Sequence, residues 1–444
     1  MKKLRNLKLL GLAGILFIAF IFAGINIIQA QVKTQGKGKP PKPPKTNCNN
    51  NGICEDGEYN TSRPYEDQTC PDCAPKDYDH LDTISMPFFL GLNAYSWSRI
   101  FQFKYINGKY VDTWASQDLG GWIEYDYGDY DSDGSTDILA VKLTSYTEGH
   151  GKKKTTYYEQ TLFVFEHGSD GSPSYERYFF GPSTKWWRNF KLADANNDGF
   201  ENELIFSNGD TLKIFHLDGT QFVNIWTSRP YGDTIYRFDV GDADGDGQNE
   251  IVCGMFKGGY ALVIDYLEND LWGDEISTEV ITVYNPDFHS IAIDQAIPCD
   301  ADNDGLSKEI IAGGNNNRLM VWALVNGEYK TVAISDDLGG FTQGIGYGDF
   351  NGDGENEIVV GTHTSTLYVF KLLCTNSDTI NPQYTLQMLQ SSTTDLFSFS
   401  HIRTGDVDYD DKIEALEGGV IFDDRGFGLQ PVFKCYYLSN PRIK

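Results

Sequence analysis

The chain has 444 residues, 63 of them acidic and 36 basic, which gives a formal net charge of −27 at pH 7. A surface this acidic is a poor match for nucleic acid, because contacts with phosphates require positive side chains. We therefore expect no nucleic-acid partner.

Residues 1–30 have the pattern of an export segment. A basic start is followed by an apolar stretch over residues 9–28 and then by Ala30, a small residue suited to cleavage. The apolar stretch is also long enough to cross a bilayer uncut. A cleaved signal peptide and a retained membrane anchor both remain open. In either case we expect the rest of the chain to be extracellular or at the cell surface, touching the membrane only through this segment.

Residues 31–47 form a linker rich in Lys, Pro and Gly, whose prolines favour an extended spacer. Residues 48–77 form a small module with four cysteines: Cys48, Cys54, Cys70 and Cys73. Four cysteines can bind zinc, but in an exported protein they favour two disulfides that staple a module too small for its own core. Three pairings are possible and the sequence does not choose among them.

The remaining residues, 78–444, contain six copies of a short acidic loop, which we number in chain order. They begin at Asp129, Asp194, Asp242, Asp300, Asp349 and Asp406. Each copy has oxygen-bearing side chains at positions 1, 3 and 5, and all but the last have Gly at position 6. Such side chains can converge on one Ca²⁺ ion, which takes six to eight oxygens, and Gly permits the sharp turn.

An acidic residue closes each loop before an apolar run. It stands at position 9 in four copies, whereas Glu203 and Glu309 follow one residue later, as if by an insertion. The sixth copy has Asp411 in place of Gly. We expect four to six Ca²⁺ ions, with these ligands: Asp129, Asp131, Asp133 and Asp137; Asp194, Asn196, Asp198 and Glu203; Asp242, Asp244, Asp246 and Glu250; Asp300, Asp302, Asp304 and Glu309; Asp349, Asn351, Asp353 and Glu357; Asp406, Asp408, Asp410 and Glu414.

Two other interpretations of the loops are weaker. An EF-hand needs a Glu at position 12 and flanking helices, but position 12 is non-acidic in the first five copies and the flanks are strand-like. One Asp/Asn/Gly cluster would be read as a simple turn. Six copies in one register favour metal binding.

The loops recur at intervals of roughly 50 to 65 residues, enough for four short strands with their connections. Fixed-period repetition of four-stranded sheets predicts an all-β β-propeller. Residues 86–117 resemble the later strands of a repeat without its loop. We read them as a divergent first blade, completed by a strand near residues 432–437. Seven blades are expected, with six as the alternative.

The repeat can be compared with a known family. An apolar strand ending in Gly-Asp, a DxDxDGxxD/E loop and an Ile/Leu-Val strand together resemble the FG-GAP/VCBS repeat of the integrin α-subunit propeller and of prokaryotic surface proteins. The resemblance covers residues 84–440. It implies a propeller, commonly seven-bladed, with Ca²⁺ held in hairpin loops on one face. The offset second and fourth loops and Asp411 depart from the pattern.

The sequence offers little catalytic apparatus. Its seven histidines are scattered, without an HExxH pair, and it has no GxSxG motif. We expect a non-enzymatic, cell-surface binding or adhesion module for a glycan or protein ligand. The alternatives are a secreted carbohydrate-active enzyme, a glycosidase or lyase, and a purely structural envelope component. Cys253, Cys299, Cys374 and Cys435 fall within the repeats, as paired or buried thiols.

Overall fold

The computed structural model describes residues 88–436 with internal gaps, the longest at 274–280, 283–291, 394–401 and 406–413. The chain divides into two compact units. The first, Met1–Thr61 with Thr69–Cys73, lies outside the described residues, as do the expected export segment, linker and Cys-rich module. All described strands belong to the second unit, Ser62–Gln68 with Ala74–Lys444.

The predicted all-β class is confirmed: the described residues form seven antiparallel sheets and one short 3-10 helix. The first three sheets are β1 (Phe88–Ala94), β2 (Trp97–Ile106) and β3 (Lys109–Ala115); β4 (Ile123–Gly128), β5 (Asp137–Glu148), β6 (Thr155–His167) and β7 (Pro173–Ser183), with η3 (Gly151–Lys153) between β5 and β6; and β8 (Trp187–Ala193), β9 (Glu203–Asn208), β10 (Thr211–Asp218) and β11 (Gln221–Thr227).

The fourth sheet has one additional strand, because β16 pairs with β14. The last four sheets are β12 (Ile235–Gly241), β13 (Glu250–Met255), β14 (Tyr260–Glu268), β15 (Leu271–Gly273) and β16 (Ile281–Thr282); β17 (Ile293–Cys299), β18 (Glu309–Gly314), β19 (Leu319–Val325) and β20 (Glu328–Ile334); β21 (Thr342–Gly348), β22 (Glu357–Thr362), β23 (Thr366–Asn376) and β24 (Gln383–Thr393); and β25 (Arg403–Gly405), β26 (Glu414–Phe422) and β27 (Leu429–Tyr436).

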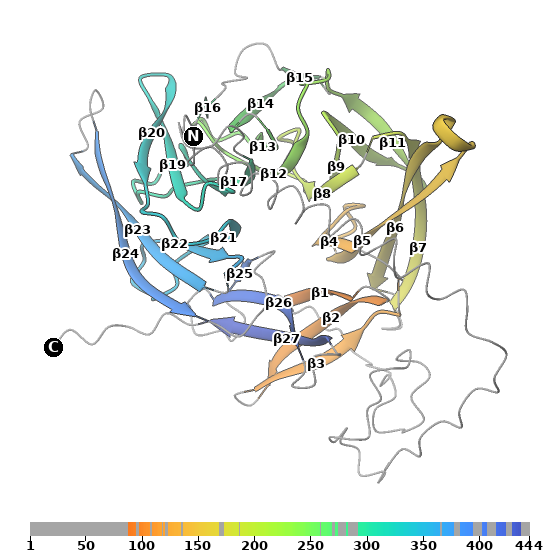
Figure 1. Cartoon of the computed structure of the whole chain (residues 1–444), viewed down its shortest axis with the longest axis horizontal. Helices are drawn as coiled ribbons and strands as arrows, with labels where there is room; N and C mark the ends of the chain where they lie inside the picture. Colours follow the sequence, from red (N-terminus) through yellow and green to blue (C-terminus); the bar gives the residue numbers. More distant parts are fainter. Residues whose placement is uncertain are drawn as a thin grey trace, which may run out of the picture. The chain divides into compact units, whose positions relative to one another are not determined.

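Consecutive sheets pack against each other along their first strands. Contacts run from β4 to β8, β12, β17, β21 and β25 in turn, and β1 contacts both β4 and β26. Figure 1 shows β1 and β26 side by side, although one is near the start and the other near the end of the described residues. The first and last sheets are therefore neighbours.

The core lies between the sheets. Five buried apolar clusters are each shared by two consecutive sheets, such as the one that joins Ile205 and Ile214 to Ile251 and Trp272. The second strands of the middle sheets, β9, β13, β18 and β22, are buried along their whole length, as near-continuous apolar runs require. The fourth strands β11 and β20 are largely exposed.

Glycine allows the first strands to approach closely. A Cβ on Gly128 would lie 2.7 Å from a side-chain carbon of Leu192 in the next sheet. A Cβ on Gly241 would likewise lie 3.1 Å from the Pro298 ring. Gly128 and Gly241, each of which precedes an acidic loop, thus allow the close packing of neighbouring sheets.

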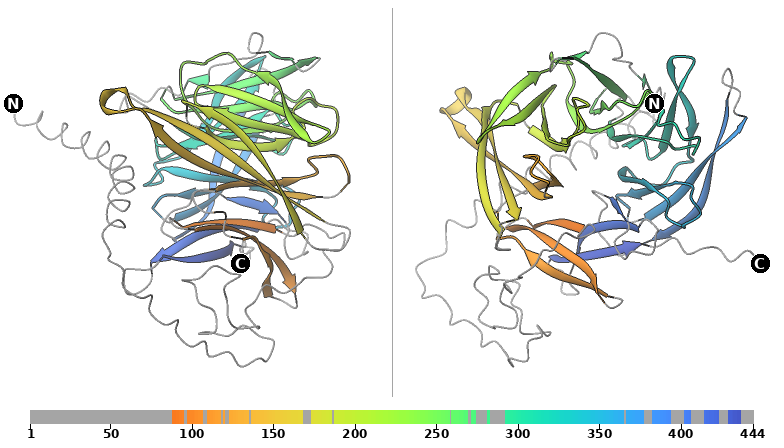
Figure 2. Two further views of the ribbon diagram at one scale, coloured as in Figure 1. Left: turned by 90° about the vertical axis from the view of Figure 1, so that its right-hand side faces the viewer. Right: turned by 180° about the vertical axis from the view of Figure 1, so that it is seen from behind.

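Strands β5 and β6 extend past their neighbours as a two-stranded arm, visible as the gold hairpin in Figure 2. The ring centroids of Tyr146 and Tyr157 stack 5.4 Å apart across it, and exposed Lys152, Lys153 and Lys154 form its tip. These are the only three consecutive basic residues in the sequence.

The described part of the chain includes three of the four cysteines within the repeats. Cys253 and Cys299 are buried, Cys374 is partly exposed, and none of these three forms a disulfide. No helix among the described residues has the length and apolar character needed to cross a membrane.

Candidate metal centre

Each acidic loop joins the first strand of a sheet to the second. The closing carboxylate is the first residue of the second strand and pairs with the residue just before the loop. The pairs are Gly128 with Asp137, Ala193 with Glu203, Gly241 with Glu250, Cys299 with Glu309, Gly348 with Glu357 and Gly405 with Glu414. The longer second and fourth loops therefore place Glu203 and Glu309 in the same register as the other closing residues.

The loop backbone is left-handed at two positions. Gly at position 6 has φ between 86° and 90° in loops 1 to 5, as the sequence pattern required. Position 4 is also left-handed, which the sequence analysis missed. It is occupied by residues that tolerate this conformation: Ser132, Asn197, Gly245, Asn303 and Gly352. The restriction of position 4 to Gly, Asn and Ser in the first five loops was the signal available in the sequence, and the sixth loop departs from it with Tyr409.

The first Asp of each loop fixes the turn. In loop 4, Asp300 accepts hydrogen bonds from the N–H groups of Asp304 (3.0 Å) and Gly305 (2.9 Å), one with each carboxylate oxygen. Asp129 and Asp194 accept the equivalent pair, and Asp242 and Asp349 accept similar bonds that include the Gly at position 4. Backbone donors thus hold the first carboxylate in place.

In three loops, three carboxylates lie close to one another. The groups are Asp129, Asp131 and Asp137; Asp242, Asp244 and Asp246; and Asp300, Asp302 and Asp304. In each group the three carboxylates offer one oxygen each, all within 4.8 Å of one another. Clustered oxygens of this kind suit a hard cation such as Ca²⁺.

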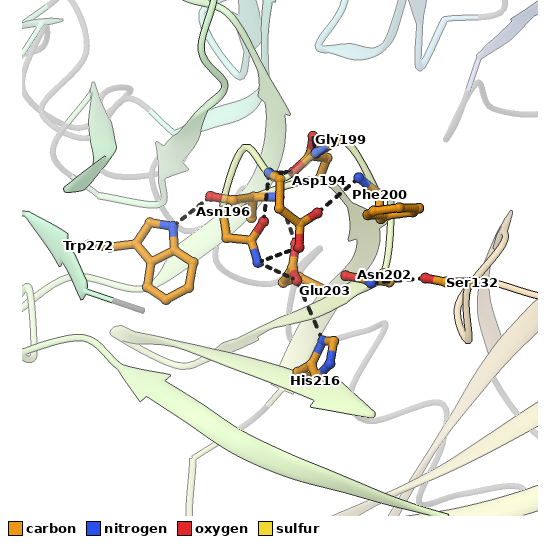
Figure 3. Close-up of polar contacts among 11 residues, drawn as sticks. Ser132, Asp194, Asn196, Gly199, Phe200, Asn202, Glu203, His216 and Trp272 are labelled. Carbon is orange, nitrogen blue, oxygen red and sulfur yellow. Dashed lines mark hydrogen bonds and ion pairs between the residues drawn. The ribbon is translucent and has the colours of Figure 1, made fainter. Parts of the chain in front are cut away.

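Loops 2 and 5 have Asn at position 3 instead. The Asn196 amide nitrogen donates to Glu203 Oε1 (3.0 Å), and Figure 3 shows both side chains turned toward one another beside Asp194. Asn351 similarly donates to Glu357, which leaves the buried Asn351 Oδ1 without a partner. Turning either amide by 180° would present its oxygen to a cation between the loop residues.

The closing carboxylate is the most buried acidic side chain of loops 1 to 5. Glu203, Glu309 and Glu357 are fully buried, and Asp137 and Glu250 are 3% exposed. In loops 2 to 5, Oε2 of the glutamate accepts the N–H of position 2, for example from Ala243 to Glu250 (2.7 Å). The other oxygen faces the loop interior, and Glu309 Oε1 is buried there without any hydrogen-bond partner. An orphaned carboxylate oxygen among further carboxylates fits a cation ligand.

Burial and neighbouring carboxylates disfavour the charged form of these residues. Burial first, and nearby Asp residues second, raise the pKa of Asp137 and Glu309 to about 8. Burial also raises the pKa of Glu203 and Glu250 to about 8 and of Glu357 to about 7, although backbone hydrogen bonds oppose it. A bound cation would remove this penalty, because it favours the ionised carboxylate.

In two loops a lysine lies beside the loop carboxylates. Lys308 pairs with Asp304 in loop 4. Lys371, which comes from β23, pairs with Glu355 in loop 5 and lies 3.6 Å from Asp353. In loop 2, His216 Nδ1 is 3.6 Å from Glu203 Oε1 (Figure 3). Lys371 and His216 lie on later strands, outside the loop motif, so the motif does not reveal them.

The predicted ligands of loop 6 fall in the undescribed segment 406–413, except for Glu414 at the start of β26. No protein-family model matches the chain, and no curated protein matches it either.

Proposed function

We propose that this chain is an exported, calcium-stabilised β-propeller that acts as a cell-surface binding or adhesion module. The observation that carries the proposal is the closing carboxylate, buried in the same register in five loops and facing other oxygen ligands. A propeller would place these loops at equivalent positions of successive blades.

The packing of the sheets supports the propeller. Each first strand contacts the first strand of the next sheet, and β1 contacts both β4 and β26. A ring of seven blades accounts for these contacts, with β1–β3 as a blade of its own. Six blades would leave β1 outside the ring despite its contacts on both sides.

The chemistry of the loops supports calcium as the metal. Their ligands are carboxylate and amide oxygens, without a histidine or cysteine at any ligand position, and this is the donor set of hard cations. Calcium at the millimolar concentrations found outside cells would fill sites of modest affinity. The expected export segment is consistent with that setting.

A hollow of about 550 Å³ between β7 and the hairpin of β10 and β11 supports a binding role. Phe179, which is 77% exposed, lines it together with Gln221. An exposed aromatic face next to an amide is chemistry that can stack on and hydrogen-bond a sugar ring. A glycan is therefore the ligand class that this surface favours.

Calcium titration into chelator-treated protein, with elemental analysis of the bound metal, tests the first half of the proposal. We expect four to six bound ions and a large gain in thermal stability. Absence of bound metal together with an unchanged melting curve would show that the loops are turns only.

Glycan-array binding in calcium tests the second half. We expect Phe179→Ala to weaken binding of a captured glycan by about five-fold, since aromatic stacking contributes on the order of 1 kcal/mol. Met388→Ala, at a residue 54% exposed on β24, serves as the matched control. A normal array signal for F179A would place the ligand elsewhere.

A further inference from the structure

Side chains at position 4 of some loops reach across to the next loop. Asn197 of loop 2 accepts the N–H of Asn249 in loop 3 (2.5 Å) and donates to its carbonyl oxygen (3.2 Å). Asn303 of loop 4 makes the same pair of bonds with Asn356 of loop 5, at 2.6 and 3.2 Å. Each Asn side chain pairs with the neighbouring backbone as a short β-bridge would. We call these two contacts the interlocks.

The partner asparagines return a second bond. The Asn249 amide donates to the carbonyl oxygen of Asp194, the first residue of loop 2 (2.8 Å). The Asn356 amide donates to the Tyr347 hydroxyl (2.6 Å), which itself donates to the carbonyl oxygen of Asp300 (2.6 Å). Positions 1 and 4 of loops 2 and 4 are therefore both tied, directly or through Tyr347, to the loop that follows.

A weaker contact joins loops 1 and 2. The amide of Asn202 donates to the Ser132 hydroxyl at 3.1 Å, again from position 4 to the residue before the closing carboxylate (Figure 3). Loops 1, 2 and 3 thus form one linked group, and loops 4 and 5 form another.

The two groups are separated where two positions change together: position 4 of one loop and the residue before the closing carboxylate of the next. Where the following loop has Asn before its closing carboxylate, position 4 is Asn or Ser. Loop 4 has Lys308 at that place, and position 4 of loop 3 is Gly245. The pattern repeats in sequence where Gly352 precedes a loop with Ile413. Gly245 has no side chain with which to bridge, and no hydrogen bond among the described residues joins loops 3 and 4.

We propose that Asn197 and Asn303 are positioning residues that couple neighbouring calcium loops, so that calcium binds cooperatively within each linked group. This inference rests on the proposed calcium binding. An interlock forms only when both loops have the closed conformation. A cation that closes one loop therefore lowers the free energy needed to close the next.

Glycine variants remove the interlocks with little backbone strain. Asn197 and Asn303 have φ near +60°, a conformation that Gly adopts readily. We expect Asn197→Gly and Asn303→Gly, separately and combined, to lower the slope of the calcium titration without changing the number of ions bound. The controls are Asn317→Gly and Asn326→Gly, which change left-handed asparagines with φ of 60° and 57° outside the loops.

A double-mutant cycle separates coupling from general destabilisation. Glu250→Gln disables loop 3, and the interlock predicts that it also weakens calcium binding at loop 2, by about 5- to 150-fold, the usual range for coupled sites. In the Asn197→Gly background the same change should remove one site and leave the others unaltered. Isothermal titration with elemental analysis measures both effects.

The converse variant would create a link. A Cβ on Gly245 would lie 3.6 Å from Lys308 Cβ, which is ordinary contact, and the φ of 82° suits Asn. Gly245→Asn combined with Lys308→Asn should join the two groups and steepen the titration.

The outcomes separate the two proposals. If the unmodified chain binds no calcium, the proposed function fails and the coupling with it. If it binds four to six ions, but the glycine variants titrate like the controls and the cycle is additive, the coupling alone is overturned.

Discussion

Loops 3 and 4 share the left-handed backbone at positions 4 and 6 but neutralise their charge differently. Loop 3 gathers Asp242, Asp244, Asp246 and Glu250, with Asp265 adding further negative potential, and no described lysine pairs with any of them. Loop 4 contains Lys308, which pairs with Asp304. Loop 3 thus has no lysine counter-charge among the described residues, whereas loop 4 carries part of its own.

If the proposed calcium binding holds, the lysine would compete with the metal. Its ammonium group offsets repulsion between the carboxylates, and that contact would have to break for a divalent ion to bind the same carboxylate. We expect loop 3 to respond strongly to calcium and loop 4 to respond less. Loop 5, with Lys371 beside Glu355, belongs with loop 4 in this respect.

Removal of calcium should give the largest effect. A site filled at a hundred times its Kd stabilises the fold by about 2.7 kcal/mol, so several sites together should raise the melting temperature by more than about 10 °C. Hydrogen exchange after chelation should accelerate more at the loop 3 amides of Gly245 and Gly247 than at Gly305 of loop 4. Equal acceleration in both loops would contradict the comparison.

Neutralising a closing carboxylate should have opposite effects on stability in the absence and in the presence of calcium. In chelator near pH 7, Glu250→Gln should stabilise the chain by at least about 1 kcal/mol, because it removes a buried carboxyl group, with a pKa raised to about 8, that must take up a proton on folding. In calcium the same variant should be destabilising, since a charged ligand is lost. Denaturant unfolding under both conditions measures this effect. Glu309→Gln in loop 4 is the matched variant, and its stability should differ less between the two conditions.

The pH dependence in chelator follows from the same residues. The closing carboxylates titrate near pH 7 to 8 in the folded chain but near 4.5 for a Glu, or 3.8 for an Asp, in the unfolded chain. Between these values the folded state holds protons that the unfolded state has released. Stability in chelator should therefore fall as the pH rises from about 4.5 to 8.

Saturating calcium should reverse most of that fall, because the ion binds the deprotonated form. Melting temperatures across the pH range, with and without calcium, provide the test. A rise in stability with pH in chelator would show that these carboxylates are ionised without metal.

Removal of the loop 4 lysine should give the smallest effect. Lys308→Gln should tighten calcium binding at one site by roughly 2- to 5-fold, the range expected for a partly exposed ion pair. It should also slightly lower stability in chelator. Lys330→Gln, whose partner Glu328 lies outside the loops, should leave both quantities unchanged.

Local sequence determined much of this arrangement. The strand–loop–strand repeat, the glycine at position 6 and the shared role of Glu203 and Glu309 all follow from residues within about ten positions of each other. The all-β class follows from the same repetition.

The remaining contacts depend on residues far apart in the chain. Asn197 meets Asn249, and Lys371 reaches loop 5 from β23, because consecutive sheets pack together and hairpins fold back. No local pattern encodes these meetings. Gly245 occurs together with Lys308, and Asn197 and Asn303 occur together with Asn249 and Asn356. The reason for this correlation is visible only when the neighbouring sheets are placed side by side.

The arm of β5 and β6 has a consequence for chain continuity. Its tip, Lys152 to Lys154, is exposed and offers a site for a protease that cleaves after lysine. A cut there would divide the chain between two strands whose ladder runs from Ile138 and Phe165 to Glu148 and Thr155. The two fragments should stay associated through that ladder after the peptide bond is lost. The arm is thus a natural place to open new chain ends, for split or permuted versions of the protein.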